Sequence, residues 1–160
     1  MAKVVIPPRA ELEKYARDNP LIHPSEVLAM LRVMRAGQDI QDIVLGGIVQ
    51  GRGISGGKFG VLIILYQRKE DLAPSELARL AGVTRATISM MLARMKRDGL
   101  ITEEADAQDG RQKHIRLTEA GLSLMEEILP AHYQRVSALM GRLTESEQEE
   151  LIRLLGKLTG

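Results

Sequence analysis

The stretch from Pro74 to Leu117 constrains the fold of this 160-residue chain more than any other segment. Pro74 suits the first turn of a helix, and Gly82 ends that helix after about two turns. Thr84 is a good N-cap for a second, longer helix that stops before Gly99. The helices are predicted at residues 75–81 and 85–97, the strands at 100–105 and 113–117, and a polar turn at 106–111. The segment therefore predicts two helices joined by a tight turn and followed by a β-hairpin.

The remainder of the chain favours helices. Aromatic residues make up 2% of the sequence and apolar residues 44%, which suits helix-on-helix packing better than a strand-rich fold. Apolar positions three and four residues apart predict a long helix from its N-cap Ser25 through Val44, and the six glycines between residues 46 and 57 predict a loop after it. Further helices are predicted at 9–18, at 58–68, after Thr118 and from a capping box at Thr144. The predicted fold class is mainly α with a small β-hairpin, an α+β chain.

Composition also argues against several functions. The chain has no cysteine, so it has no disulfide, thiolate nucleophile or cysteine-bound zinc. Its three histidines lack metal-ligand spacing and no nucleophile stands beside a base, so we expect no metal, no cofactor and no enzymatic activity. The absence of a signal peptide and of an apolar run of about 18 residues predicts a cytoplasmic protein without a membrane span. The net charge is +1, so affinity for a polyanion depends on locally gathered charge.

The predicted helix 85–97 divides its surface in a way that suits DNA reading. Helix, turn, helix and hairpin in this order form the plan of a winged helix-turn-helix, whose second helix enters the major groove. At about 100° per residue, one side of the helix is an apolar stripe for the core, formed by Ile88, Met91, Leu92 and Met95. The opposite side carries small or hydroxyl residues, a methionine and two arginines: Ala86, Thr87, Met90, Ala93, Arg94 and Arg97. Small residues allow close approach to base edges, and arginines reach bases or phosphates.

Positive charge is concentrated along the same segment. Five basic residues lie between positions 79 and 97 with no acidic residue among them: Arg79, Arg85, Arg94, Lys96 and Arg97. Such a patch is the electrostatic signature of nucleic-acid binding. A solvated helix face is the alternative explanation, and a winged-helix module that binds a partner protein is the alternative function. DNA binding through about eight phosphate contacts would weaken steeply with salt, whereas an apolar protein interface would not.

Three runs of residues carry a resemblance to a known family. Ser75–Ala78, Val83–Leu100, and Asp109-Gly110-Arg111 followed by Leu117–Gly121 resemble the MarR family of transcriptional regulators. The resemblance implies a homodimer, usually a repressor, that reads a pseudo-palindromic operator with its recognition helix in the major groove and its wing in the minor groove. It also implies control by a small aromatic or phenolic ligand in a crevice between the dimerisation helices and the winged helix, which would draw on the helix from Val27, the segment near Phe59 to Tyr66 and the start of the helix after Thr118.

The hairpin contributes the second part of the expected DNA site. The tip residue Arg111 is expected in the minor groove, held by Asp109 through a bidentate pair, with further positive charge at Lys113 and Arg116 on the return strand. A solvent-exposed turn is the alternative. The complete predicted DNA site consists of Arg85, Ala86, Thr87, Met90, Arg94, Arg97, Arg111 and Lys113, with Asp109 supporting the wing.

Two features depart from the family pattern. Many relatives have a basic residue where this chain has Met90, so the operator sequence is not predicted. The outgoing strand of the hairpin carries Glu103 and Glu104, and Asp106 follows it, although a strand that contacts phosphates would favour positive charge. This strand is therefore expected to face away from DNA or to weaken binding.

The terminal helices carry more apolar surface than a winged helix needs. The helix from Val27 and the stripe Leu151–Leu158 are most simply buried between two copies of the chain, as the resemblance also implies, and packing inside a larger monomer is the alternative. The predicted organisation is an N-terminal arm at 1–24, a dimerisation helix and loop at 25–57, the winged helix-turn-helix at 58–118 and C-terminal dimerisation helices at 119–160.

Overall fold

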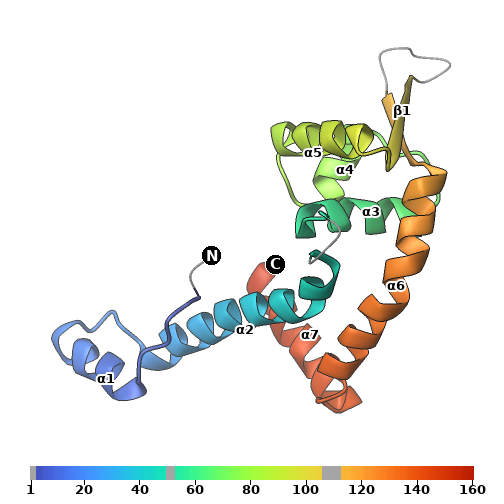
Figure 1. The fold of residues 1–160 in the computed structure, drawn as a ribbon. Helices are drawn as coiled ribbons and strands as arrows, with labels where there is room; N and C mark the ends of the chain where they lie inside the picture. Colours follow the sequence, from blue (N-terminus) through green and yellow to red (C-terminus); the bar gives the residue numbers. More distant parts are fainter. Residues whose placement is uncertain (1–2, 50–52, 106–112) are drawn as a thin grey trace. The chain divides into compact units, whose positions relative to one another are not determined.

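The structure is a computed structural model that describes residues 3–49, 53–105 and 113–160 (Figure 1). The predicted fold class is confirmed, because helices dominate the described residues and β1 and β2 form an antiparallel hairpin. The elements in chain order are α1 (Arg9–Asp18), α2 (Pro24–Val49), α3 (Gly56–Arg68), α4 (Pro74–Leu80), α5 (Arg85–Arg97), β1 (Ile101–Ala105), β2 (Lys113–Leu117), α6 (Glu119–Met140) and α7 (Glu145–Thr159). The chain divides into two compact units, Met1–Gly47 and Ile48–Gly160.

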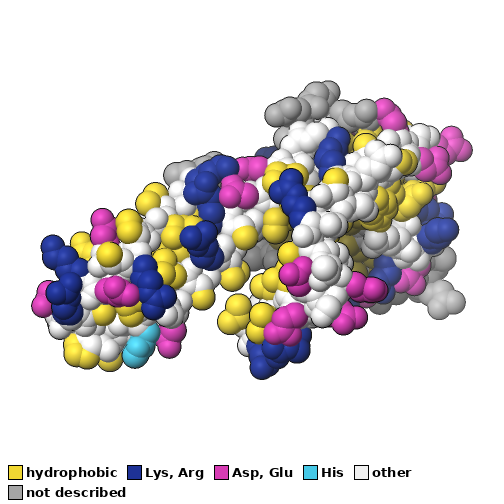
Figure 2. All heavy atoms as spheres, turned by 90° about the horizontal axis from the view of Figure 1, so that it is seen from below, with side chains coloured by type: hydrophobic (Ala, Val, Ile, Leu, Met, Phe, Trp, Pro, Cys, Tyr) yellow, Lys and Arg dark blue, Asp and Glu magenta, His cyan; other side chains and the backbone are white. Residues whose placement is uncertain are grey.

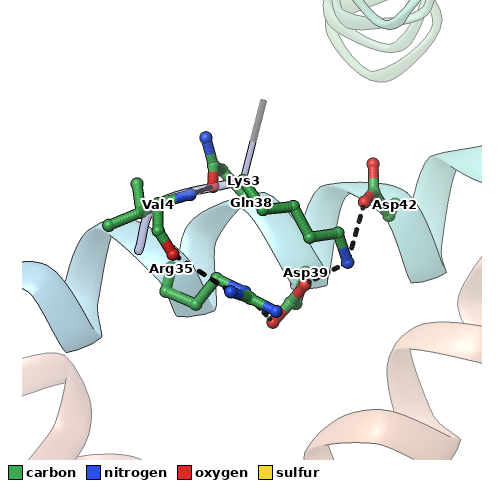
Figure 3. Close-up of polar contacts among 6 residues, drawn as sticks. All are labelled: Lys3, Val4, Arg35, Gln38, Asp39 and Asp42. Carbon is green, nitrogen blue, oxygen red and sulfur yellow. Dashed lines mark hydrogen bonds and ion pairs between the residues drawn. The ribbon is translucent and has the colours of Figure 1, made fainter. Parts of the chain in front are cut away.

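In the N-terminal unit, the first described residues lie along α2. Lys3 Nζ donates to Asp39 Oδ1 at 2.7 Å, and Val4 N–H donates to Gln38 Oε1 at 2.9 Å (Figure 3). Arg35 donates from Nη1 to the Val4 carbonyl at 3.0 Å and from Nε to Asp39 Oδ2 at 2.9 Å. Hydrogen bonds from Lys3 and then from Arg35 lower the pKa of Asp39. The predicted arm is therefore attached to α2, and its predicted helix is confirmed as α1.

Two predicted boundaries around α2 are wrong. The helix begins at Pro24, so Ser25 lies in its first turn and is not the N-cap. The helix also continues through Gly46-Gly47, where we predicted a loop. A glycine costs a helix about 1 kcal/mol relative to alanine, but Ile48 is only 2% exposed, and its burial offsets part of that cost. Likewise the N-cap Ser55 starts α3 before the last two glycines of the predicted loop.

The C-terminal unit holds the core of the winged helix. α3, α4, α5 and the hairpin contribute side chains that are almost fully buried: Val61, Leu62, Leu77, Ile88, Met95 and Ile115. The antiparallel register places Ile101 opposite Leu117 at the root of the hairpin. Leu72 extends this sheet, since its N–H donates to the Ile115 carbonyl at 3.3 Å and its own carbonyl accepts from Ile115 N–H at 2.9 Å. The recognition helix α5 and the hairpin lie at the same end of this unit (Figure 1).

A threonine and a glycine join the hairpin to α6. Thr118 Oγ1 accepts a hydrogen bond from Gly121 N–H at 3.0 Å and donates to the Gly99 carbonyl at 2.7 Å. A Cβ atom at position 121 would overlap the backbone carbonyl oxygen of Leu100. Because only glycine lacks that atom, the run Leu117–Gly121 forms a close joint that fixes the start of α6.

The helix α7 leaves its apolar side open to solvent. Its predicted capping box is confirmed, with Thr144 Oγ1 accepting from Glu147 N–H at 3.4 Å and the Glu147 carboxylate accepting from Thr144 N–H at 2.8 Å. None of the described residues of α7 is buried. Its large apolar side chains are 36% to 71% exposed: Leu151, Ile152, Leu154, Leu155 and Leu158.

The helix α2 also has open apolar positions. Its exposed large apolar side chains are Met30, Val33, Met34, Ile40 and Ile43. The space-filling view shows hydrophobic side chains open to solvent between charged ones (Figure 2). No described helix combines the length and the apolar character needed to cross a membrane.

Candidate nucleic-acid interface

The recognition helix α5 is oriented by its cap and its buried side. The predicted N-cap is confirmed, because Thr84 Oγ1 accepts a hydrogen bond from Thr87 N–H at 3.1 Å. The predicted core stripe has three buried members and one half-buried member: Ile88, Leu92 and Met95, and Met91. With this side fixed against the core, the opposite side of α5 faces outward.

The structure places most of the predicted α5 site residues on the outward side. Met90 is 59% exposed. The other exposed members are Arg85, Ala86, Arg94 and Arg97. Thr87 is half-buried, and its Oγ1 lies 2.9 Å from Thr84 Oγ1. The hydroxyl of Thr87 is therefore hydrogen-bonded to the side chain of the N-cap residue.

The outward side of α5 keeps its positive charge. Among the described residues, neither Arg85 nor Arg94 takes part in an ion pair. Arg97 Nη2 lies 3.6 Å from Asp98 Oδ1, at an exposed position where ion pairs contribute little. These guanidinium groups are therefore available to phosphate oxygens and to acceptors on base edges.

A contact that the sequence analysis missed anchors the end of α5. Lys58 on α3 donates to the C-cap residue Asp98 at 2.5 Å, and the Lys58 side chain is only 14% exposed. This hydrogen bond lowers the pKa of Asp98. The two residues are 40 positions apart, so no local pattern in the sequence signals their pairing.

The root of the hairpin is held by a bidentate pair. Arg116 on β2 donates through Nε and Nη2 to both carboxylate oxygens of Asp71, at 2.7 and 2.5 Å. The hydrogen bond from Arg116 lowers the pKa of Asp71. Arg116, which we expected to add positive charge to the wing, instead ties β2 to the segment before α4.

The described part of the wing pairs its charges internally. Lys113 Nζ lies 2.8 Å from Glu103 Oε1, and Lys96 Nζ lies 3.2 Å from Glu103 Oε2. Hydrogen bonds from Lys113 and then from Lys96 lower the pKa of Glu103, against the opposing effect of burial. Arg111 and Asp109 lie outside the described residues, so their expected pairing stays a prediction.

A pocket of about 460 Å³ lies beside the hairpin in the same unit. The end of α3, β2 and the start of α6 supply its apolar walls: Leu65, Tyr66, Leu117 and Leu122. The Asp71–Arg116 pair contributes charged groups to the lining. Two of the regions that the sequence analysis assigned to a ligand crevice, the segment ending at Tyr66 and the first turns of α6, therefore meet at one pocket.

Comparison with known proteins identifies the family. The sequence pattern of the MarR family matches residues 52–112. The HTH-type transcriptional repressor YetL from Bacillus subtilis is 38% identical over 109 residues, which cover 68% of this chain and 65% of YetL, slightly less than two thirds of its length. The transcriptional regulator HosA from Escherichia coli O157:H7 is 35% identical over 90 residues, which cover 56% of this chain and 67% of HosA.

A solved structure shows the same fold. The crystal structure of Sco3205, a MarR family transcriptional regulator from Streptomyces coelicolor in complex with DNA, matches with a TM-score of 0.77 at 24% identity and covers 85% of this chain and 86% of that chain. The chain belongs to the MarR family, as its motifs predicted. YetL and HosA are named as transcriptional regulators and not as enzymes, in agreement with the predicted lack of a catalytic site.

Proposed function

We propose that the protein is a homodimeric, DNA-binding transcriptional repressor that reads a pseudo-palindromic operator. The observation that carries the proposal is the exposed, positively charged side of α5. This helix lies beside a β-hairpin in one compact unit (Figure 1). This arrangement fits a duplex, because a helix fills the major groove while an adjacent hairpin reaches the neighbouring minor groove. The similarity to the transcriptional repressor YetL and to Sco3205 in its complex with DNA supports the same interpretation.

The proposed DNA site keeps the predicted residues. Arg94 and Arg97 contact phosphates or base acceptors, and the exposed side chain of Met90 meets the base edges by apolar contact. Arg111 enters the minor groove, where narrow A·T tracts concentrate negative potential, and Asp109 holds its guanidinium. The remaining members of the proposed site are Arg85, Ala86, Thr87 and Lys113.

Homodimer formation would bury the open apolar positions of α2 and α7. A lone chain would leave these side chains in water, and a twofold interface is the commonest way for identical chains to cover such positions. Two recognition helices then address half-sites about 34 Å apart along the duplex. This spacing is the physical reason for expecting a pseudo-palindrome.

Ligand control is proposed for the pocket beside the hairpin. Its volume of about 460 Å³ lies within the range of small-molecule sites. The apolar walls fit an aromatic ring, and the carboxylates of Glu70 and Glu126 in the lining fit the hydrogen of a phenolic hydroxyl. A ligand of this class releases the repressor if it binds the DNA-free conformation better than the DNA-bound one.

Selection of bound fragments from random duplex DNA tests the proposal. The expected result is a pseudo-palindrome whose affinity falls steeply with salt, since each phosphate contact adds about 0.9 to the slope of log affinity against log salt. Failure to enrich any duplex would overturn the proposal in favour of a winged helix that binds a partner protein. Enrichment of an asymmetric single site would overturn the homodimer alone.

A further inference from the structure

Glu103 joins three elements at the edge of the proposed DNA surface. Its carboxylate forms ion pairs with two lysines. Lys96, in the last turn of α5, lies at 3.2 Å, and Lys113, the first residue of β2, lies at 2.8 Å. Glu103 itself lies in the middle of β1, and its side chain is 26% exposed. The three side chains therefore connect the end of the recognition helix to both strands of the wing.

The strand geometry explains why Glu103 and not Glu104 makes these contacts. Alternate residues of a strand point to opposite faces, so Glu103 shares a face with the buried Ile101. Lys113 is opposite Ala105 in the register, which makes it a diagonal neighbour of Glu103 within reach of a long side chain. Glu104 lies on the other face and is exposed.

We propose that Glu103 is a positioning residue that fixes the wing to the end of α5 and so sets the angle at which the hairpin meets DNA. The inference rests on the proposed DNA binding. A carboxylate near phosphates ordinarily weakens binding by repulsion, which is what the sequence analysis expected of this strand. Here two ammonium groups face that carboxylate, so the three side chains together carry a charge of +1 and present no net negative charge to a phosphate.

The two views of Glu103 predict opposite signs for its neutralisation. If the carboxylate only repels phosphates, E103Q binds every duplex more tightly. If it positions the wing, E103Q loses affinity for the selected duplex by about fivefold, a typical size for the loss of one coupling within a charge network, and keeps or gains affinity for unrelated duplex. E104Q is the matched control, because it removes the same charge from the next residue of β1 and is expected not to lower the ratio of the two affinities.

A charge exchange between α5 and β1 tests the contact itself. K96E and E103K each place like charges together, and we expect each to lower the ratio of affinity for selected over unrelated duplex. The double variant K96E/E103K has the net charge of the parent and re-forms an opposite pair between α5 and β1, although the new ammonium group at position 103 still faces Lys113, so we expect it to recover part of that ratio. Additive losses in the double variant, or tighter specific binding by E103K alone, would overturn the positioning role.

A measurement without DNA separates this inference from the proposed function. Hydrogen exchange of the β2 backbone amides is expected to be faster in E103Q than in the parent and in E104Q, because the wing loses its charged side-chain link to the end of α5. Unchanged exchange overturns the inference even if the parent selects an operator. If the parent selects no duplex, the proposed function fails, and with it any effect of Glu103 on DNA reading, whatever the exchange result.

Discussion

The helices α5 and α7 are both amphipathic and similar in length, but they use their apolar sides differently. The described residues of α5 bury Ile88, Leu92 and Met95 inside the C-terminal unit, and those of α7 bury no side chain at all. An amphipathic pattern therefore predicts a helix, but it does not tell whether the apolar side of that helix is buried within the chain. The winged helix completes its core within one chain, whereas α7 leaves its apolar side chains exposed to solvent.

Charge distribution shows the same contrast. The outward side of α5 carries arginines that are either unpaired with described residues or weakly paired, as at Arg97. In α7 the exposed Arg153 donates twice to Glu150, at 2.7 and 2.6 Å. Surplus positive charge thus marks the surface proposed for DNA, and surplus apolar area marks the surface proposed for a second copy.

The largest effect is expected from replacing two exposed leucines of α7 by aspartate. L155D/L158D would place charges on the open apolar side and is expected to dissociate the proposed dimer and to lower affinity for the selected duplex by about 100-fold or more, because each proposed half-site would have to bind alone. Sedimentation and DNA titration measure the two effects. E149A on the same helix serves as the control, and a fully dimeric L155D/L158D protein would refute the assignment of α7.

A methyl group at position 121 is expected to destabilise the winged helix, with no change to α7. G121A would force a Cβ atom against the Leu100 carbonyl, and we expect a loss of about 2 kcal/mol in the free energy of unfolding. Chemical denaturation provides the value. G60A offers the comparison, because a Cβ atom there meets no other atom within 4 Å; equal stability of the two variants would contradict the close joint.

Replacing single arginines tests whether positive charge on α5 and on the hairpin contributes to DNA affinity while positive charge on α7 does not. R94A is expected to lower operator affinity by about tenfold, the range of one base or phosphate contact, with the dimer intact. R111A should act similarly at the hairpin tip, with its loss confined to A·T-rich flanks. R153A on α7 is the charge-matched control. Operator binding by R94A at the affinity of the parent would remove Arg94 from the site.

Loss of the N-cap is a smaller change within α5. T84A deprives Thr87 N–H of its acceptor, which costs about 1 kcal/mol in unfolding free energy. T144A removes the corresponding cap from α7 and should cost a similar amount. The two variants are expected to differ in DNA affinity, since only T84A disturbs the end of the helix that is proposed to approach the bases. Equal DNA affinity for both would weaken that distinction.

Acid provides the smallest expected effect. The hydrogen bond from Arg116 holds the pKa of Asp71 below its usual value, so this pair stabilises the fold fully above about pH 4 and loses that contribution as the pH falls through the lowered pKa. In D71N the melting temperature at neutral pH is expected to be slightly lower, and its fall in acid less steep, than in the parent. E149Q serves as the control. If the melting temperatures of D71N and the parent fall in parallel from pH 7 to 2, the Asp71–Arg116 pair does not contribute to stability as proposed.

The parts of the fold that follow from short-range patterns were predictable from the sequence. Thr84 and Thr144 cap their helices as predicted, because an N-cap requires only residues within one turn. The stop of α2 was not predictable in this way, since Gly46-Gly47 locally predicts a break in the helix and the burial of Ile48 cannot be read from that local pattern.

The candidate site shows the same limit. The outward side of α5 follows from helical periodicity, but the pairing of Lys58 with Asp98 links residues 40 positions apart. The acidic strand was interpreted by charge alone as unfavourable for DNA. Its partners Lys96 and Lys113 come from different elements, and charge counting along one strand does not reveal them.

The pairing of Leu72 with Ile115 runs through main-chain atoms alone. Both side chains are also buried, at 2% and 1% exposure, so the core at the base of the wing accepts only apolar residues of similar volume. The exposed positions of the hairpin and α5 carry no such constraint, so a lineage is able to change the surface proposed for DNA while the buried base that supports it stays the same.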